Sequence, residues 1–139
     1  MEVFILCGFV GFSSFKKNIS NKFCEDILVQ MNSTLSRRGP DEDGIYLGNH
    51  ICLGHKRLIV IDPEGGKQPM VSTASYGDYV IVYNGQLYNT KELKETLILN
   101  GFSFNGHCDT EVLLKSYIYY GKDVVNHLNG IFAFAIWDC

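Results

Sequence analysis

The sequence is poor in the features that mark several common classes of protein. Its net charge is only −3, which gives no field that would gather nucleic acid or an anionic membrane. It has three prolines and no proline-rich linker, internal repeat or low-complexity segment that would mark a second domain. A chain of 139 residues with 46% hydrophobic content is therefore expected to form one folded domain.

The cysteines lack the spacing that indicates a metal site or a disulfide framework. There are five of them, an odd number, and no two form a Cys-x-x-Cys pair. No histidine cluster accompanies them, so neither zinc nor a set of disulfides is predicted. They are Cys7, Cys24, Cys52, Cys108 and Cys139.

Long apolar runs and a secretory leader are also missing. The uncharged stretch over residues 3–12 has ten residues and two glycines, whereas a helix that crosses a bilayer needs about 20 apolar residues. No basic leader or small-residue cleavage site accompanies it. We therefore expect a cytoplasmic protein with no membrane or nucleic-acid partner.

What is present is a mixed pattern of strands and helices. Gly48-Asn49-His50 is typical of a tight connection between two antiparallel strands. The apolar run at residues 131–137 is typical of a central strand. Strands are expected over residues 3–12, 44–47, 51–55, 79–83 and 131–137.

Helical spacing of apolar residues predicts three helices. The first covers residues 20–36, with Asn18 or Ser20 at its start. The second covers residues 90–100, where Asn89 opens a sequence that resembles a capping box. The third covers residues 109–120, with Asp109 or Thr110 as its cap. The expected stops are Gly39-Pro40, Asn100-Gly101 and Gly121.

Cys7 stands near the start of the chain, where a thiol has a special chemical possibility. A terminal cysteine carries its own base, because a free α-amine with a pKa of about 7.7–8 can accept the thiol proton at neutral pH. Met1–Leu6 hold the nitrogen of Cys7 in an amide, so this chemistry requires their removal. Taken alone, Cys7 is more simply interpreted as a small buried residue of an apolar strand.

Four motifs after Cys7-Gly8 favour the chemical interpretation. They are, in chain order, Arg38-Gly39-Pro40-Asp41, His55-Lys56-Arg57-Leu58, Tyr83-Asn84-Gly85-Gln86-Leu87-Tyr88-Asn89 and Cys108-Asp109-Thr110-Glu111. Together with Cys7 they resemble the class II glutamine amidotransferases, specifically the N-terminal glutaminase domain of glutamine-hydrolysing asparagine synthetases. The segment from Tyr83 to Asn89 is the most specific of them.

The resemblance implies an α+β fold of the N-terminal-nucleophile type, an αββα sandwich of two antiparallel sheets between helical layers. It also implies that residues 7–139 are the amidotransferase domain, incomplete at the C-terminus, and that residues 1–6 are an extension. A synthetase domain follows in the family, and its phosphate-binding loop does not occur in this sequence. ATP and Mg are expected only in that absent domain, and no metal or cofactor is expected for the glutaminase step.

The resemblance also assigns the catalytic residues. Cys7 is expected to attack the carboxamide carbon of glutamine, form a thioester and release ammonia for the synthesis of asparagine from aspartate. The side chain of Asn84 and the N–H of Gly85 are expected to donate to the oxyanion. By itself, the Asn84-Gly85 pair favours a hairpin turn instead.

The substrate-binding residues follow in the same way. Arg57 is expected to pair with the α-carboxylate of glutamine through its planar guanidinium, the alternative being a solvated arginine at a strand end. Asp109 is expected to bind the α-ammonium. Gln86 replaces a glutamate that helps hold the same ammonium in the family, and its neutral carbonyl gives a weaker bond. Leu58, Ile59, Val60 and Ile61 extend the segment that contacts the substrate, mostly through backbone groups.

Two other polar groups are interpreted as structural. In the Arg38–Asp41 motif the Gly-Pro pair forces a turn, and Asp41 is expected to accept hydrogen bonds from nearby backbone N–H groups. Arg37 stands where the family has a histidine before this motif. His55 is the other candidate base, and a structural role is preferred for it.

Two classes of function therefore stay open. The chain is either a glutaminase domain, which supplies ammonia to a synthetase domain or a separate ammonia-accepting chain, or a non-catalytic remnant or glutamine-binding module with a blocked nucleophile. The blocked amine and Gln86 favour the second class, whereas the retained site residues favour the first. Initiation at Leu6 followed by removal of that residue, or cleavage of a short propeptide, would free the amine of Cys7.

Overall fold

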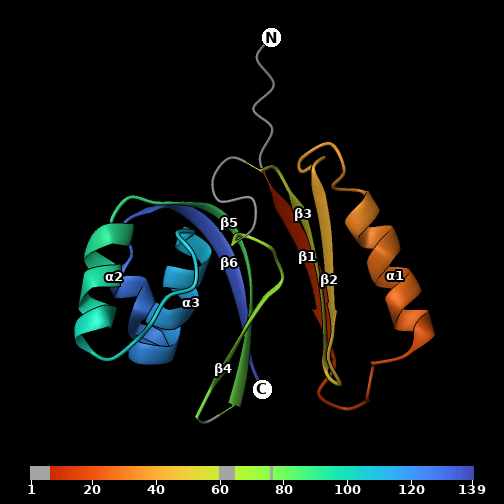
Figure 1. Ribbon diagram of the computed structural model, residues 1–139. Helices are drawn as coiled ribbons and strands as arrows, with labels where there is room; N and C mark the ends of the chain where they lie inside the picture. The colour runs from red at the N-terminus through yellow and green to blue at the C-terminus, as the bar shows by residue number, and fades with distance from the viewer. Residues whose placement is uncertain (1–6, 60–64, 76) are drawn as a thin grey trace. The chain divides into compact units, whose positions relative to one another are not determined.

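The computed structural model describes residues 7–59, 65–75 and 77–139. These residues form two compact units, each with its own antiparallel sheet, with one helix in the first unit and several in the second (Figure 1). The first unit falls within Met1–Val60 and Lys67–Pro69, and the second within Ile61–Gly66 and Met70–Cys139.

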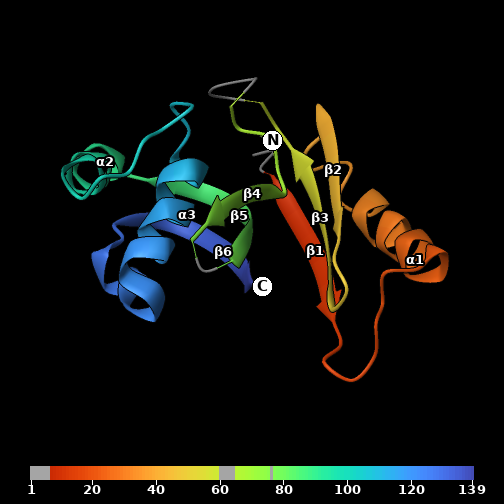
Figure 2. The same ribbon diagram turned by 60° about the horizontal axis from the view of Figure 1, so that its bottom comes forward.

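The first unit is a three-stranded sheet with one helix on one of its faces, as Figure 2 shows. Its elements are, in chain order, β1 (Gly8–Ser13), α1 (Lys22–Ser33), β2 (Glu42–Leu47) and β3 (Ile51–Arg57). The strand order is β1-β3-β2, and both pairs are antiparallel. Cys24 and Leu28 of α1 pack with Cys52 of β3 in a small buried cluster.

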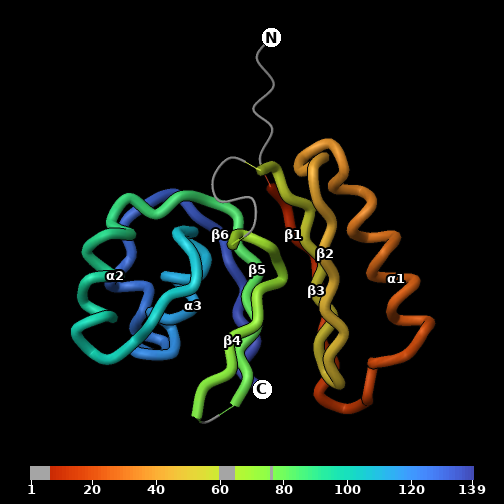
Figure 3. Tube along the Cα trace, in the orientation of Figure 1, coloured from red at the N-terminus to blue at the C-terminus, as the bar shows by residue number. Residues whose placement is uncertain are grey.

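The second unit is also a three-stranded antiparallel sheet, and its helices gather on one face, as the trace in Figure 3 shows. Its elements are β4 (Met70–Ala74), β5 (Gly77–Leu87), α2 (Thr90–Leu99), α3 (Asp109–Tyr120), the 3-10 helix η1 (Gly121–His127) and β6 (Gly130–Asp138). The strand order is β4-β5-β6. The long central strand β5 therefore pairs on both sides.

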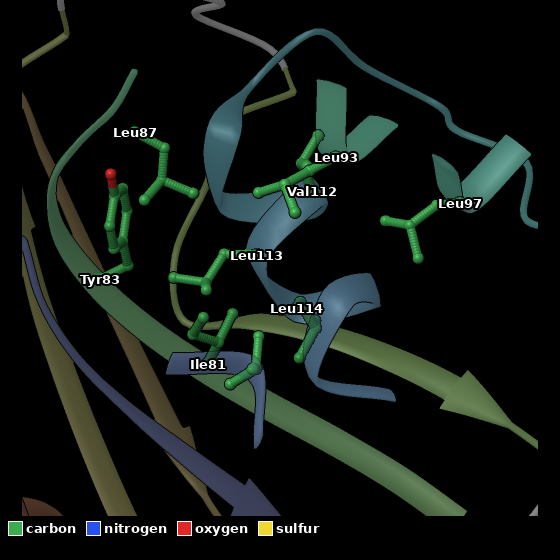
Figure 4. Packing of buried hydrophobic residues seen from close by; sticks show 9 residues of the cluster. Ile81, Tyr83, Leu87, Leu93, Leu97, Val112, Leu113 and Leu114 are labelled. Carbon is green, nitrogen blue, oxygen red and sulfur yellow. The ribbon is translucent and has the colours of Figure 1, made fainter. Parts of the chain in front are cut away.

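The larger buried core lies in the second unit, where α2 and α3 cover β5 (Figure 4). Alternate residues of β5 point into this core because successive side chains of a strand lie on opposite faces. The buried members are Ile81, Tyr83, Leu87, Leu93, Leu97, Val112, Leu113, Leu114 and Val124. This packing fixes the N-terminal end of α3 beside β5.

Several local predictions are confirmed. Strands β2 and β3 form the expected hairpin, and the N–H of Gly48 donates to the carbonyl of Ile51 at 2.8 Å. The helices expected over residues 90–100 and 109–120 are α2 and α3. They end beside Gly101 and Gly121, whose φ angles of 88° and 61° lie in the left-handed region that glycine adopts at least cost. Residues 8–12 of the first predicted strand lie in β1, and residues 3–6 lie outside the described residues.

The predicted start of the first helix is wrong by a few residues. Neither Asn18 nor Ser20 is the cap. Asn21 is the N-cap, and its side chain accepts a hydrogen bond from the N–H of Cys24 at 3.0 Å. The helix also ends earlier than predicted, at Ser33.

Asn89 is the N-cap of α2, where the predicted capping box begins, but its side chain makes no cap hydrogen bond. The predicted cap of α3 is wrong. In both cases a long-range contact engages the side chain that was expected to cap the helix. The amide of Asn89 donates to the carbonyl of His127 at 2.8 Å and accepts from the N–H of Asn129 at 3.0 Å, so it forms no cap bond with α2. The N-cap position of α3 is Cys108, and no side chain caps that helix. Asp109 makes other contacts, which bear on the candidate site.

The sheet of the second unit differs from the prediction in two ways. Residues 131–137 do form a strand, but β6 lies at the edge of the described sheet and not in its centre. Strand β4 and the 3-10 helix η1 were not predicted, because neither has a strong apolar period.

The predicted fold class is confirmed, since the described residues form an α+β fold with two antiparallel sheets and helices packed against them. Within the described part of the chain, none of the helices has both the length and the apolar character needed to span a membrane.

Candidate active site

Cys7 lies directly before β1, and its side chain is half-buried. The N–H of Leu58 points at the sulfur, with 3.2 Å between nitrogen and Sγ, and the carbonyl oxygen of Leu58 lies 3.6 Å from Sγ. Cys7 is therefore not the fully buried strand residue of the simpler interpretation. An N–H aimed at the sulfur is placed to stabilise negative charge on it.

The Arg38–Asp41 motif holds the chain around Cys7. Arg38 donates through Nε to the carbonyl oxygen of Cys7 at 3.2 Å. Gly39 is buried against β3, where a Cβ atom would lie 2.2 Å from the carbonyl carbon of Lys56. Only glycine allows this approach, so the motif has a packing role.

Asp41 completes the motif by bonding to the segment that follows β3. It accepts a hydrogen bond from the N–H of Ile59 at 2.8 Å through Oδ2, and its own N–H donates to the carbonyl of Arg57 at 3.1 Å. The expectation that Asp41 binds backbone N–H groups is confirmed. These bonds fix the backbone on both sides of Leu58, which in turn contacts Cys7.

Arg57 is buried at the end of β3, with 5% of its surface exposed. Its Nη1 donates to Oε2 of Glu42 at 2.9 Å. The alternative of a solvated arginine is therefore wrong. A planar guanidinium carries five N–H donors in a fixed fork, which suits it to binding carboxylates. Sequence reasoning missed Glu42, because nothing in the motif links it to Arg57.

The remaining residues of this predicted segment divide into two sets. The backbone N–H of Leu58 contacts the Cys7 sulfur, and the backbone N–H of Ile59 donates to Asp41. Val60 and Ile61 lie outside the described residues. His55 is buried, with 1% of its surface exposed, and its carbonyl accepts from Asn32 at 3.4 Å, which agrees with a structural role.

In the second unit, Asn84, Gly85 and Gln86 lie inside β5 and not in a turn. They pair with Ala133, Phe132 and Ile131 of β6. The hairpin alternative is therefore wrong. Gly85 is required at this point, because a Cβ atom there would lie 2.3 Å from the carbonyl oxygen of Ile131. The side chains of Asn84 and Gln86 lie on the opposite face of β5 from those of Tyr83 and Leu87.

Asp109 contacts β5 through one carboxylate oxygen. Oδ2 accepts from the hydroxyl of Tyr83 at 2.7 Å and from the N–H of Leu87 at 3.2 Å. Burial, followed by the hydrogen bond with Asp109, raises the pKa of Tyr83 above its ordinary value. The hydroxyl is therefore a protonated donor at physiological pH. Tyr83 was not predicted as a site residue, because no local spacing rule joins it to Asp109.

The predicted site residues thus form two groups, one in each unit. Cys7, Arg57, Leu58 and Ile59 belong to the first, and Asn84, Gly85, Gln86 and Asp109 belong to the second. All five cysteines are free thiols. Among the described residues, no three His, Cys, Asp or Glu side chains are grouped so that they could hold a metal ion.

Comparison with solved structures points to the class of protein. The fold is similar to that of glutamine phosphoribosylpyrophosphate amidotransferase from Bacillus subtilis, solved with ADP and GMP, with a TM-score of 0.55 and 28% sequence identity. The similarity covers 66% of this chain and 21% of that chain. That protein is an amidotransferase of the N-terminal-nucleophile type, so the described fold is that of this class.

The family follows from sequence comparison. The chain belongs to the glutamine amidotransferase domain family, whose model matches residues 6–139. It is 48% identical over 133 residues to glutamine-hydrolyzing asparagine synthetase 3 of Bacillus subtilis, a match that covers 96% of this chain and 21% of that protein. Glutamine-hydrolyzing asparagine synthetase 1 of the same organism is 42% identical over 135 residues, and that match also covers 96% of this chain and 21% of the relative.

A plant protein shows the same relationship. Glutamine-hydrolyzing asparagine synthetase 1 of Arabidopsis thaliana is 37% identical over 111 residues, covering 80% of this chain and 18% of that protein. The chain thus spans about a fifth of the length of the curated relatives it matches. The predicted resemblance to the glutaminase part of asparagine synthetases is confirmed.

Proposed function

We propose that residues 7–139 are a glutaminase domain that hydrolyses glutamine to glutamate and ammonia through Cys7. The observation that carries the proposal is the Cys7 thiol with the Leu58 N–H aimed at it, 3.2 Å away, in a member of the glutamine amidotransferase family. Membership of this family favours an enzyme over a non-catalytic binding module.

The proposed reaction begins with the Cys7 thiolate. Its sulfur attacks the carboxamide carbon, and the carbonyl oxygen becomes an oxyanion that the amide of Asn84 and the N–H of Gly85 stabilise. The α-amine that accepted the thiol proton returns it to the leaving nitrogen, so ammonia departs and a glutamyl thioester remains. Water then cleaves the thioester to give glutamate and restores the thiol. No cofactor is needed, because the thiol, the amine and water supply every step.

Substrate recognition is assigned to charged groups at both ends of the amino acid. Arg57 binds the α-carboxylate through its planar guanidinium. Asp109 binds the α-ammonium, assisted by Gln86. The backbone of residues 58–61 extends the contact with the substrate.

The proposal requires that the active form begins at Cys7. Met1–Leu6 are proposed to be an extension that is absent from this form, because only a free α-amine on Cys7 can act as the base. The match to the family model begins at residue 6, next to the nucleophile, which supports this starting point.

The ammonia is proposed to be used in making asparagine from aspartate. The names of the relatives support this acceptor. The acceptor site, with ATP and Mg, would belong to a synthetase domain or to a separate chain. We place this activity in the cytoplasm.

An ammonia-release assay tests the proposal. Three proteins are compared: the 139-residue chain, a chain that begins at Cys7, and the latter with Cys7→Ser. Release of ammonia from glutamine is expected from the second protein alone. Binding of glutamine without release would instead support the non-catalytic alternative. Equal release by the Cys7→Ser protein would exclude Cys7 as the nucleophile.

A further inference from the structure

The two carboxylate oxygens of Asp109 have different surroundings. Both of its described hydrogen bonds, from the Tyr83 hydroxyl and the Leu87 N–H, end on the same oxygen, Oδ2. No hydrogen bond to Oδ1 occurs among the described residues. The carboxylate therefore has one oxygen that fixes its orientation and one that is available to a ligand.

The position of Tyr83 makes it a rigid support for Asp109. Only 3% of its surface is exposed, and its ring is part of the core formed by β5, α2 and α3 (Figure 4). Asp109 is the first residue of α3, where the positive end of the helix dipole also favours a carboxylate. The hydroxyl thus comes from a side chain that packing prevents from moving.

We propose that Tyr83 is a positioning residue for ammonium recognition: its hydroxyl orients Asp109 so that Oδ1 faces the α-ammonium of glutamine. This inference rests on the proposed function, which assigns Asp109 to that ammonium. A carboxylate that is already oriented loses less conformational entropy when the ligand binds. The support matters in this chain because Gln86 offers only a neutral carbonyl to the same group.

Equilibrium binding to the 139-residue chain tests the inference without requiring turnover. Calorimetry compares L-glutamine with 4-carbamoylbutanoate, which is glutamine without its α-ammonium. The variants are Tyr83→Phe and, as a matched control, Tyr119→Phe, which removes a hydroxyl bonded to the exposed side chain of Asn100 at 3.0 Å. The melting temperature of each variant is measured alongside.

Tyr83→Phe is expected to weaken glutamine binding about 10-fold, the scale of one hydrogen bond to a charged group. Binding of 4-carbamoylbutanoate should not change, and Tyr119→Phe should change neither ligand. In an Asp109→Asn background, Tyr83→Phe should have no further effect on glutamine, because the group it positions is already lost. In a form that turns over, Tyr83→Phe should raise KM and leave kcat within about two-fold.

Equal weakening of both ligands by Tyr83→Phe, or no weakening of either, would overturn the inference. So would a Tyr83→Phe chain that does not fold, or an unchanged effect of Tyr83→Phe in the Asp109→Asn background. The proposed function can fail separately. If the chain that begins at Cys7 binds glutamine but releases no ammonia from it, the proposed enzyme activity fails, whereas the selective loss of glutamine binding in Tyr83→Phe would still support the role of Tyr83.

Discussion

At the scale of single residues, the candidate site depends on polar side chains that are held by partners within the same unit. Arg57 is bonded to Glu42, Asp109 to Tyr83, and the Cys7 sulfur to the backbone of Leu58. Burial without such a partner would be costly, since an unpaired buried charge is strongly destabilising.

Substitution of Arg57 tests the first of these pairs. Arg57→Lys keeps one positive charge for Glu42 but removes the planar fork that can serve a second carboxylate. We expect KM for glutamine to rise about 10- to 100-fold, equivalent to one hydrogen bond between charged groups. Lys56→Arg is the control, since Lys56 pairs with the exposed Asp43 next to it on the sheet. An unchanged KM in Arg57→Lys would remove Arg57 from substrate binding.

The roles of these residues could be predicted only in part. Cys7, Arg57 and Asp109 were identified because they stand in motifs, and a motif is local in sequence. Their partners Glu42 and Tyr83 stand 15 and 26 residues away along the chain. No periodic pattern carries such a pairing, so only the folded chain reveals it. The cap assigned to Asp109 failed for the same reason, because a long-range contact outweighed a local preference.

At the scale of elements, α2 is held to the second unit by one apolar face. Leu97 is fully buried, with 0% of its surface exposed, whereas Leu99 is 87% exposed on the same helix. We expect Leu97→Ala to lower the free energy of unfolding by about 2–5 kcal/mol. Leu99→Ala is the matched control and should change it by less than about 0.5 kcal/mol. Urea unfolding measures both, and equal effects would contradict the packing described for α2.

The loop that leads into α3 is tied down by Glu111. Burial raises the pKa of this carboxyl, but hydrogen bonds from Lys115 and from the N–H groups of Asn105 and Gly106 lower it, and the net shift is downward. The folded-state pKa therefore lies below the unfolded value of about 4.3. The ionised group stabilises the fold above that unfolded value, and the contribution is lost as pH falls through the folded-state pKa.

Glu111→Gln tests this contribution through its pH dependence. The variant should be less stable than wild type at pH 7, and the difference should narrow as the pH is lowered below about 4, where the wild-type carboxyl becomes protonated. Glu95→Gln on α2 is the control, since Glu95 is largely exposed and lies 4.0 Å from Lys91. Urea unfolding at several pH values gives the free energy of unfolding of the wild type and of the two variants. A difference that is independent of pH would contradict the role of Glu111.

Elements with a strong apolar period were predictable, and the others were not. The bounds of α3 match the predicted range 109–120, because its apolar residues and Gly121 mark both the helix and its end. Strand β4 is short and carries Ser72 and Thr73, so it has no pattern that distinguishes it from a loop. The Asn84-Gly85 pair favours a turn locally, yet pairing of β5 with β6 holds it in an extended strand.

At the scale of the whole molecule, family membership and local geometry support the same proposal. The chain belongs to the glutamine amidotransferase domain family and spans 21% of its Bacillus subtilis relatives. We propose the glutaminase half-reaction for this part and assign the use of ammonia to a partner domain or chain. The motifs were sufficient to predict the family, because they follow one another along this chain in the order that the family has.

The central claim is that the Cys7 sulfur becomes a nucleophile once its own nitrogen is free. Mass spectrometry of protein quenched during reaction with glutamine tests this directly, because it locates the glutamyl thioester. We expect an adduct on Cys7 in the chain that begins at this residue, and none on the 139-residue chain. A thioester that forms equally well while Met1–Leu6 remain attached, or that forms on another cysteine, would contradict it.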